Sequence, residues 1–184
     1  MLGPYRIEGY AIISADGMIA DAGGLMPDTL KNPADQDYFS RALDAAAVVV
    51  HGRNSHEGQA NSPRRKRLVV TRAVATLGPD TNANALLWNP AGASLPAACR
   101  ALAVETGVVA AIGGTEVFGL FLDLGYDAFH LTRASAARLP GGRPLFPEVP
   151  ARTPEEVLAS RGLRLLAERV LDAAAGVTLA QWRR

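Results

Sequence analysis

The chain has 184 residues, of which 48% are hydrophobic and 20% charged, a balance typical of one soluble globular domain. Nineteen Lys and Arg residues nearly balance eighteen Asp and Glu residues. The net charge of +1 therefore gives no field that would favour nucleic acid or a membrane surface as partner. No stretch approaches the ~18 consecutive apolar residues of a membrane span, and the first residues lack the pattern of a signal peptide. The single cysteine, Cys99, is expected to be a buried thiol in a reducing compartment. We predict a cytoplasmic protein with one domain over residues 1–184.

Strand and helix patterns alternate through the first two-thirds of the chain. Asn32 can cap a helix in which Pro33 takes the first position and Asp35 favours the first turn. A second helix is predicted over 95–106, ended by Gly107. Strands are expected over 5–15, 18–20, 46–50, 68–71, 85–88 and 128–132, with loops over 21–28 and 139–147.

The segment from Val108 to Leu122 combines three features of an anion site. A buried strand runs into Gly113 and Gly114, and a helical pattern begins directly afterwards. Paired glycines allow a ligand to approach the backbone closely, and a helix N-terminus attracts negative charge. Taken alone, this segment is equally compatible with a tight strand-to-helix turn that binds nothing.

The C-terminal part of the chain changes pattern. Residues 163–171 and 177–182 read as two strands joined by a turn near Gly176, although 163–168 could also form a helix. Alternating strands and helices followed by a hairpin predict an α/β fold with a mixed sheet.

Three strand ends carry residues suited to phosphate groups, and ligands of such sheets gather at the carboxyl ends of strands. Gly52, Arg53, Asn54 and Ser55 follow one strand and are expected to open a helix, a setting that suits a pyrophosphate. Thr71 and Arg72 end another strand and suit a phosphate monoester. No G-x-G-x-x-G, Walker A or zinc-type motif is present, and His51 and His56 are not spaced as a helical metal pair. We expect no metal site. His56 is expected at the surface and His130 to be structural.

Six segments in order resemble the dihydrofolate reductase-like superfamily, including the reductase domain of the bifunctional riboflavin-pathway deaminase-reductase. They are 13–20, 49–57, 67–72, 112–118, 125–132 and 144–147. The resemblance implies a three-layer α/β/α fold with a mixed central sheet and a C-terminal antiparallel hairpin. It also implies NADPH as hydride donor and a homodimer. The cofactor-binding residues are expected to be Gly52, Arg53, Asn54, Ser55, Thr71, Arg72, Gly113, Gly114, Thr115, Glu116 and Val117.

The resemblance also suggests residues for catalysis and substrate binding. The segment from Asn32 to Asp35 is similar to the one that carries the catalytic acid of dihydrofolate reductases, and Thr132 matches the threonine that bonds that acid. Asp35 is equally compatible with a purely structural role in the first turn of its helix. Ser14, Asp16 and Phe39 are the expected substrate-binding residues.

Two substrate classes remain open. Ser14, Asp16, Gly17 and the segment 141–146 are similar to the riboflavin-type enzymes, which reduce a ribosylaminopyrimidine. A dihydrofolate or pterin reductase is the alternative, and a non-catalytic nucleotide-binding protein with the same fold is a third hypothesis. The basic run 64–67 could bind a substrate phosphate or carboxylate, but a solvated strand entry is the preferred interpretation.

Overall fold

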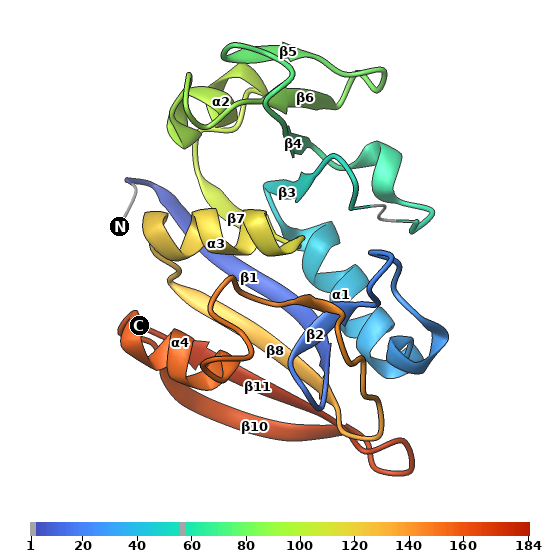
Figure 1. Cartoon of the computed structure of the whole chain (residues 1–184). Coiled ribbons are helices and arrows are strands. Elements are labelled where there is room, and N and C mark those ends of the chain that lie inside the picture. The colour runs from blue at the N-terminus through green and yellow to red at the C-terminus, as the bar shows by residue number, and fades with distance from the viewer. Residues whose placement is uncertain (1–2, 56–57) are drawn as a thin grey trace.

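A computed structural model describes residues 3–55 and 58–184, and within them a nine-stranded sheet runs in the order β10-β11-β8-β1-β7-β3-β4-β6-β5 (Figure 1). Its strands are β1 (Tyr5–Ser14), β3 (Val48–Gly52), β4 (Arg67–Val70), β5 (Leu77–Pro79), β6 (Ala85–Trp88), β7 (Gly107–Ala111), β8 (Ala128–Ala134), β10 (Arg164–Asp172) and β11 (Val177–Arg183). The central strands from β8 to β6 are parallel, whereas β11, β10 and β5 pair antiparallel with their neighbours. The predicted mixed sheet with a C-terminal antiparallel hairpin is confirmed.

Helices cover both faces of this sheet. They are α1 (Pro33–Ala45), α2 (Leu95–Ala101), α3 (Thr115–Leu124) and α4 (Pro154–Ser160), with short 3₁₀ turns at Asp28–Leu30 and Ser62–Arg64. The larger hydrophobic cluster joins one face to α2, α3 and α4, and a smaller cluster joins the other face to α1. The molecule is therefore a three-layer α/β/α sandwich, as expected.

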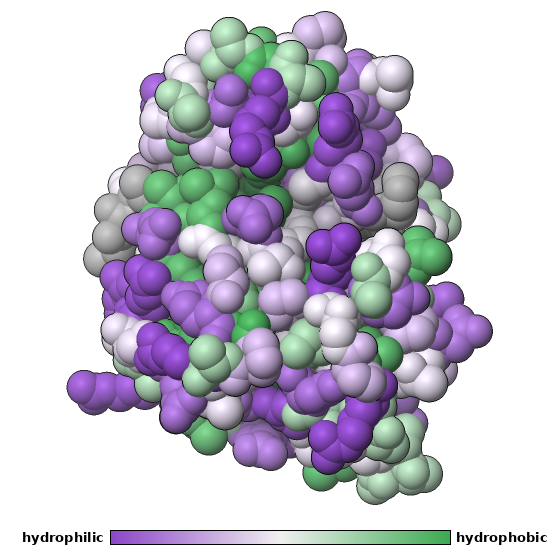
Figure 2. All heavy atoms as spheres, viewed as in Figure 1, coloured by the Kyte–Doolittle hydropathy of each residue, from purple (hydrophilic) through white to green (hydrophobic). Residues whose placement is uncertain are grey.

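Alternation along the strands explains why two faces can be buried at once. Val48 and Val50 of β3 belong to the larger cluster, whereas Val49 between them packs with Leu43 on the α1 side. A strand buried on both faces needs apolar residues at every position, which is the pattern of a continuous apolar run. Figure 2 shows a hydrophobic area on the visible face near α2 and α3, within a surface that is otherwise largely hydrophilic.

The start of α1 forms as the sequence predicts. The Asn32 side chain accepts hydrogen bonds from the backbone N–H groups of Ala34 and Asp35, at 3.0 and 3.3 Å. Pro33 follows as the first helical residue, where its missing N–H costs nothing. This cap places Asp35 in the first turn, buried against the sheet.

Two predicted helices are corrected. The helix expected over 95–106 ends at Ala101, because Ala103 adopts a left-handed conformation and Val104 turns into the core. Gly107 begins β7 instead of capping a helix. After Gly52 the chain makes a turn at 53–54, and the described residues that follow form no α-helix before β4.

The short strand expected over 18–20 is present, but several other short elements were not predicted. A two-stranded sheet joins β2 (Met18–Ala20) to β9 (Arg143–Pro144), and β5 extends the far edge of the main sheet. The helix α4 begins with a full capping box, in which Thr153 and Glu156 satisfy each other's backbone N–H groups. In the described part of the chain no helix is long and apolar enough to cross a membrane.

Candidate functional site

The three strand ends singled out in the sequence meet at one edge of the sheet. β7, β3 and β4 are parallel neighbours, so their carboxyl ends lie side by side (Figure 1). The Gly52 N–H donates to the Gly113 carbonyl at 2.8 Å, which joins the ends of β3 and β7 directly. Thr71 continues β4 by donating its N–H to the carbonyl of Trp88.

The glycine turn leaves open space at this edge. Among the described residues, a Cβ built on Gly114 would find only Ser55 Oγ at 3.7 Å and Ile19 Cδ1 at 4.0 Å, so none of them fills that position. Gly113 has φ of +113°, a conformation that side chains rarely adopt. Gly114 is also the N-cap of α3 and provides no side-chain cap. The first turn of α3 therefore presents backbone N–H groups toward this space.

Polar side chains surround the same edge at different depths. Arg53, Asn54 and Arg72 are exposed, Ser55 is half-buried and Thr71 is buried. Val117 packs beneath Gly52, because a Cβ built on Gly52 would lie 3.5 Å from Val117 Cγ2. Two guanidinium groups, hydroxyl groups and a helix N-terminus form a donor set that fits an extended dinucleotide phosphate. His56 and Glu57 lie outside the described residues.

Two residues at the start of α3 have different environments. The Thr115 hydroxyl donates to the Pro144 carbonyl at 2.5 Å and so joins α3 to β9. Glu116 is exposed. Thr115 is thus already bonded to the protein, whereas its backbone N–H lies in the first helical turn.

Asp35 and Thr132 are brought together from α1 and β8. Both are buried, with 8% and 2% exposure, and the Thr132 hydroxyl bonds the Asp35 carboxyl. Burial raises the pKa of Asp35 above its ordinary value, and the hydrogen bond from Thr132 only partly opposes this effect. A buried carboxyl with a raised pKa can hold and donate a proton.

Phe39 lies one turn along α1 from Asp35 and is half-buried. It packs against the smaller cluster together with Ile112, the residue that precedes the glycine turn. The helix that carries Asp35 and the segment that leads into Gly113 therefore pack against the same apolar cluster.

Ser14 and Asp16 are hydrogen-bonded within the protein. Ser14 Oγ donates to Asp16 Oδ1 at 2.5 Å, and the backbone N–H of Leu139 donates to both carboxylate oxygens at 3.1 Å. Burial opposes the ionisation of Asp16, but these hydrogen bonds outweigh it and lower its pKa. The pair joins the end of β1 to the 139–147 loop, and its role in substrate binding stays a prediction.

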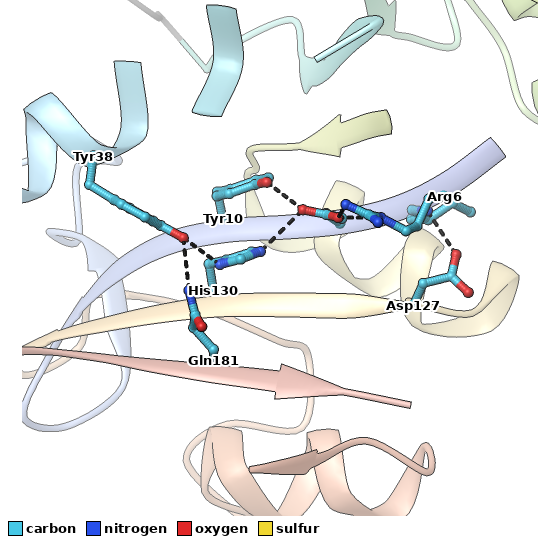
Figure 3. Close-up of polar contacts among 8 residues, drawn as sticks. Arg6, Tyr10, Tyr38, Asp127, His130 and Gln181 are labelled. Atoms are coloured by element: carbon cyan, nitrogen blue, oxygen red, sulfur yellow. Dashed lines mark hydrogen bonds and ion pairs between the residues drawn. The ribbon is translucent and has the colours of Figure 1, made fainter. Parts of the chain in front are cut away.

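Sequence reasoning missed a buried polar cluster beneath α1 (Figure 3). Glu8 accepts hydrogen bonds from Tyr10 at 2.5 Å and pairs with His130 Nε2 at 3.1 Å. His130, which was expected to be structural, is buried and bonds Tyr38 of α1 and Glu8 of β1. The only sequence signal was a glutamate and a histidine inside otherwise apolar strands.

The basic run does not contribute to this edge. Arg65 is buried and its guanidinium bonds Asp44, Gln59 and Ser40. Arg67 opens β4, so the run lies at the end of the strand opposite Thr71. Among the described residues no group of His, Cys, Asp and Glu could hold a metal ion. Cys99 is buried as expected, and burial raises the pKa of its thiol to about 11.

Comparison with protein-family models and with curated proteins finds no match to the sequence. Solved structures do match. A protein from Shewanella sp. PV-4, described as a riboflavin biosynthesis protein, has a TM-score of 0.66 at 20% identity, covering 97% of this chain and 98% of its own. Dihydrofolate reductase from Enterococcus faecalis, complexed with NADP(H) and RAB-propyl, has a TM-score of 0.64 at 19% identity, covering 97% of this chain and 96% of its own.

A two-activity enzyme matches over part of its length. The diaminohydroxyphosphoribosylaminopyrimidine deaminase/5-amino-6-(5-phosphoribosylamino)uracil reductase from Thermotoga maritima has a TM-score of 0.64 at 14% identity. The match covers 97% of this chain but 56% of that protein. The chain therefore has the dihydrofolate reductase-like fold, and at these identities the comparison establishes the fold alone.

Proposed function

We propose that this protein, with its dihydrofolate reductase-like fold, is an NADPH-dependent reductase of the 5-amino-6-(5-phosphoribosylamino)uracil reductase type. One observation carries the proposal. Three phosphate-compatible strand ends meet at the sheet edge, and a buried acid, Asp35, lies on the helix that packs beside the same edge. This combination suits a bound dinucleotide next to a group that can supply a proton.

The chain offers separate residues for each part of the cofactor. The space beside Gly114 and the first turn of α3 would hold the diphosphate, together with Ser55 and Arg53. Thr71 and Arg72 would take the 2′-phosphate that distinguishes NADPH from NADH. When bound, the cofactor supplies the hydride. The protein positions the cofactor and the substrate and excludes water.

The chain's own acid chemistry would come from Asp35. Its raised pKa keeps a fraction of the carboxyl protonated nearer to neutral pH than an ordinary aspartate, and Thr132 fixes its orientation. Phe39, one turn further along α1, would form an apolar wall for a planar ring. Ser14 and Asp16 would act at the other end of the substrate, by supporting the 139–147 loop.

Cofactor titration is the first test. NADPH and NADH are titrated while the fluorescence of Trp88 and Trp182 and the melting temperature are followed. If neither nucleotide changes either signal, the reductase proposal fails. Loss of NADPH absorbance is then followed with the aminopyrimidine ribose phosphate and with dihydrofolate. Turnover of dihydrofolate alone would favour the dihydrofolate or pterin reductase alternative.

We also propose that two copies associate through β10. This nine-residue strand is bonded on one side only and its first seven residues are exposed, including Leu165, Leu166 and Val170 at 49%, 60% and 62%. Long, exposed, apolar strand edges favour pairing with another strand. The pairing of β10 with β11 has an irregularity between Leu165 and Ala167. In antiparallel self-pairing centred there, Arg164 of each copy would lie near Glu168 of the other. This charge pattern is self-complementary and so favours a second copy over a foreign strand.

A further inference from the structure

A row of polar side chains crosses the sheet beneath α1. Tyr10, His130 and Gln181 lie directly opposite one another on β1, β8 and β11. Thr132 lies two residues beyond His130, on the same face of β8. Asp35 and Tyr38 lie one turn apart on α1. Asp35 bonds Thr132, and Tyr38 bonds His130 at 2.6 Å, so α1 contacts two successive rows of the sheet.

The hydrogen bonds in this row have one direction (Figure 3). The Gln181 amide nitrogen can only donate, and it lies 3.3 Å from the Tyr38 oxygen. The ionised Glu8 carboxylate can only accept, so His130 Nε2 carries a hydrogen, and in the neutral ring Nδ1 accepts from the Tyr38 hydroxyl. That Nε2–H donates to Glu8. The chain of donors thus runs from β11 through α1 and β8 to β1.

Glu8 is the acceptor at which the chain ends. Tyr10 and His130 bond its Oε2, and the exposed Arg6 pairs with its Oε1 at 2.5 Å. Burial alone would raise the pKa of Glu8, but the bonds from His130 and Tyr10 and the charge of Arg6 lower it to about 2. Glu8 therefore stays ionised and remains the acceptor at which the chain of donors ends.

Contacts on the faces of the rings fix the same geometry. His130 stacks on Tyr10 with ring centroids 4.4 Å apart and planes 2° from parallel. The Arg169 guanidinium of β10 covers the Tyr38 ring at 5.0 Å. Buried polar networks of this kind add little stability compared with apolar packing, and their best-attested use is to select one arrangement.

We propose that Tyr38, His130 and Glu8 are positioning residues, which fix the rotation of α1 on the sheet and thereby hold the Asp35 carboxyl against Thr132. The proposal rests on the role proposed above for Asp35. Tyr38 is the decisive member, because it is the one that connects α1 to the row. The charged or titratable groups that face Tyr38 are Glu8, Tyr10, Asp35, His130 and Arg169.

Tyr38→Phe removes the hydroxyl that joins α1 to His130 and keeps the ring. Tyr10→Phe is the matched control, because it also removes a hydroxyl bonded to this network but leaves α1 untouched. The readout is the titration of the Asp35 carboxyl carbon by NMR in the protein without ligands, assigned by its loss in Asp35→Asn. We expect Tyr38→Phe to increase the acid dissociation constant of Asp35 about threefold, because a looser helix admits water. Tyr10→Phe leaves it unchanged.

A second variant covers the possibility that Tyr38→Phe disturbs folding. Gln181→Met keeps the size of the side chain and removes the donor that orients the Tyr38 proton, and we expect a smaller increase in the same direction. The proposal is overturned if both variants leave the Asp35 titration at the wild-type value, or if Tyr10→Phe moves it as far as Tyr38→Phe does.

Turnover gives a second readout. If the wild-type protein oxidises NADPH, Tyr38→Phe should lower kcat several-fold and leave the KM for NADPH unchanged. The reason is that Tyr38 is not among the residues proposed to bind the cofactor. If the wild-type protein shows no turnover, the proposed function fails, while the NMR titration still decides whether Tyr38 positions Asp35.

Discussion

Asn32 Nδ2 donates to Asp172 Oδ2 at 2.9 Å, across 140 residues of sequence. Asn32 is the N-cap of α1, and Asp172 is the last residue of β10. One buried amide therefore closes the helix that carries Asp35 and joins it to the C-terminal hairpin.

Asn32→Ala should remove both functions at once. Loss of an N-cap costs about 1–2 kcal/mol of unfolding free energy. Ser94→Ala is the control, because Ser94 caps α2 at an exposed site and its side chain bonds only Ala97. Urea denaturation measures both variants. Equal losses would mean that the link to Asp172 adds nothing.

Gly114→Ala and Gly114→Val test the cofactor edge in two steps. The space beside Gly114 accepts a Cβ without a clash, so we expect both variants to fold. The added atoms lie where the diphosphate would bind, and the affinity for NADPH should fall modestly with Ala and by at least about tenfold with Val. Fluorescence titration gives the affinities, and the melting temperature is the control. Unchanged NADPH affinity in Gly114→Val would remove this turn from the site.

Asp35→Asn tests the raised pKa through stability. Between the ordinary value of 3.8 and the raised value, the folded protein binds more protons at this site than the unfolded chain. Stability from this group is therefore lost as the pH rises through that window. The variant should gain stability relative to wild type over the same pH range, and turnover should be abolished while NADPH binding remains.

Asp28→Asn is the control for the pH series. Asp28 is exposed, and its hydrogen bond with Lys31 lowers its pKa, so its contribution has the opposite sign and is lost as the pH falls. If Asp35→Asn and wild type show parallel stability curves between acid and neutral pH, the Asp35 carboxyl does not have a raised pKa.

The β10 edge predicts a charge-dependent dimer. Leu166→Lys places two ammonium groups opposite each other at the centre of the proposed pairing, and sedimentation should show a weaker dimer by at least about tenfold. Leu25→Lys, at a loop residue that is 68% exposed, is the control. Arg164→Glu should also weaken the dimer, and adding Glu168→Arg should restore it. A wild-type monomer would end this proposal.

Local signals in the sequence placed most elements of the fold. Asn32 and Pro33 specify the start of α1, and the apolar run before Gly113 specifies a strand buried on both faces. The end of α2 could not be predicted, because Ala103 turns there to bring Val104 into the core, which is a demand of the tertiary structure. The helix α4 had a readable capping box in Thr153 and Glu156, and that signal was overlooked.

The residues of the candidate site also fall into those that the sequence could predict and those that it could not. Gly52, Thr71 and Gly113 could be found because each stands at or just beyond the carboxyl end of a strand, and parallel strands bring such ends together. Resemblance paired Asp35 with Thr132, and the structure places them in contact. The pairing of Glu8 with His130 had no local signal, because strand register decides which side chains of β1 and β8 meet.

The position of β1 has a consequence for how the chain folds. Its two neighbours are β7 and β8, so Tyr5 pairs with Gly107 and Glu8 with Ala128. Both partners of β1 therefore lie about 100 residues later in the chain, and parallel pairing over such separations is slow because the loop must close first. We expect folding to be limited by this closure, with the N-terminal strand the last part of the central sheet to gain its hydrogen bonds.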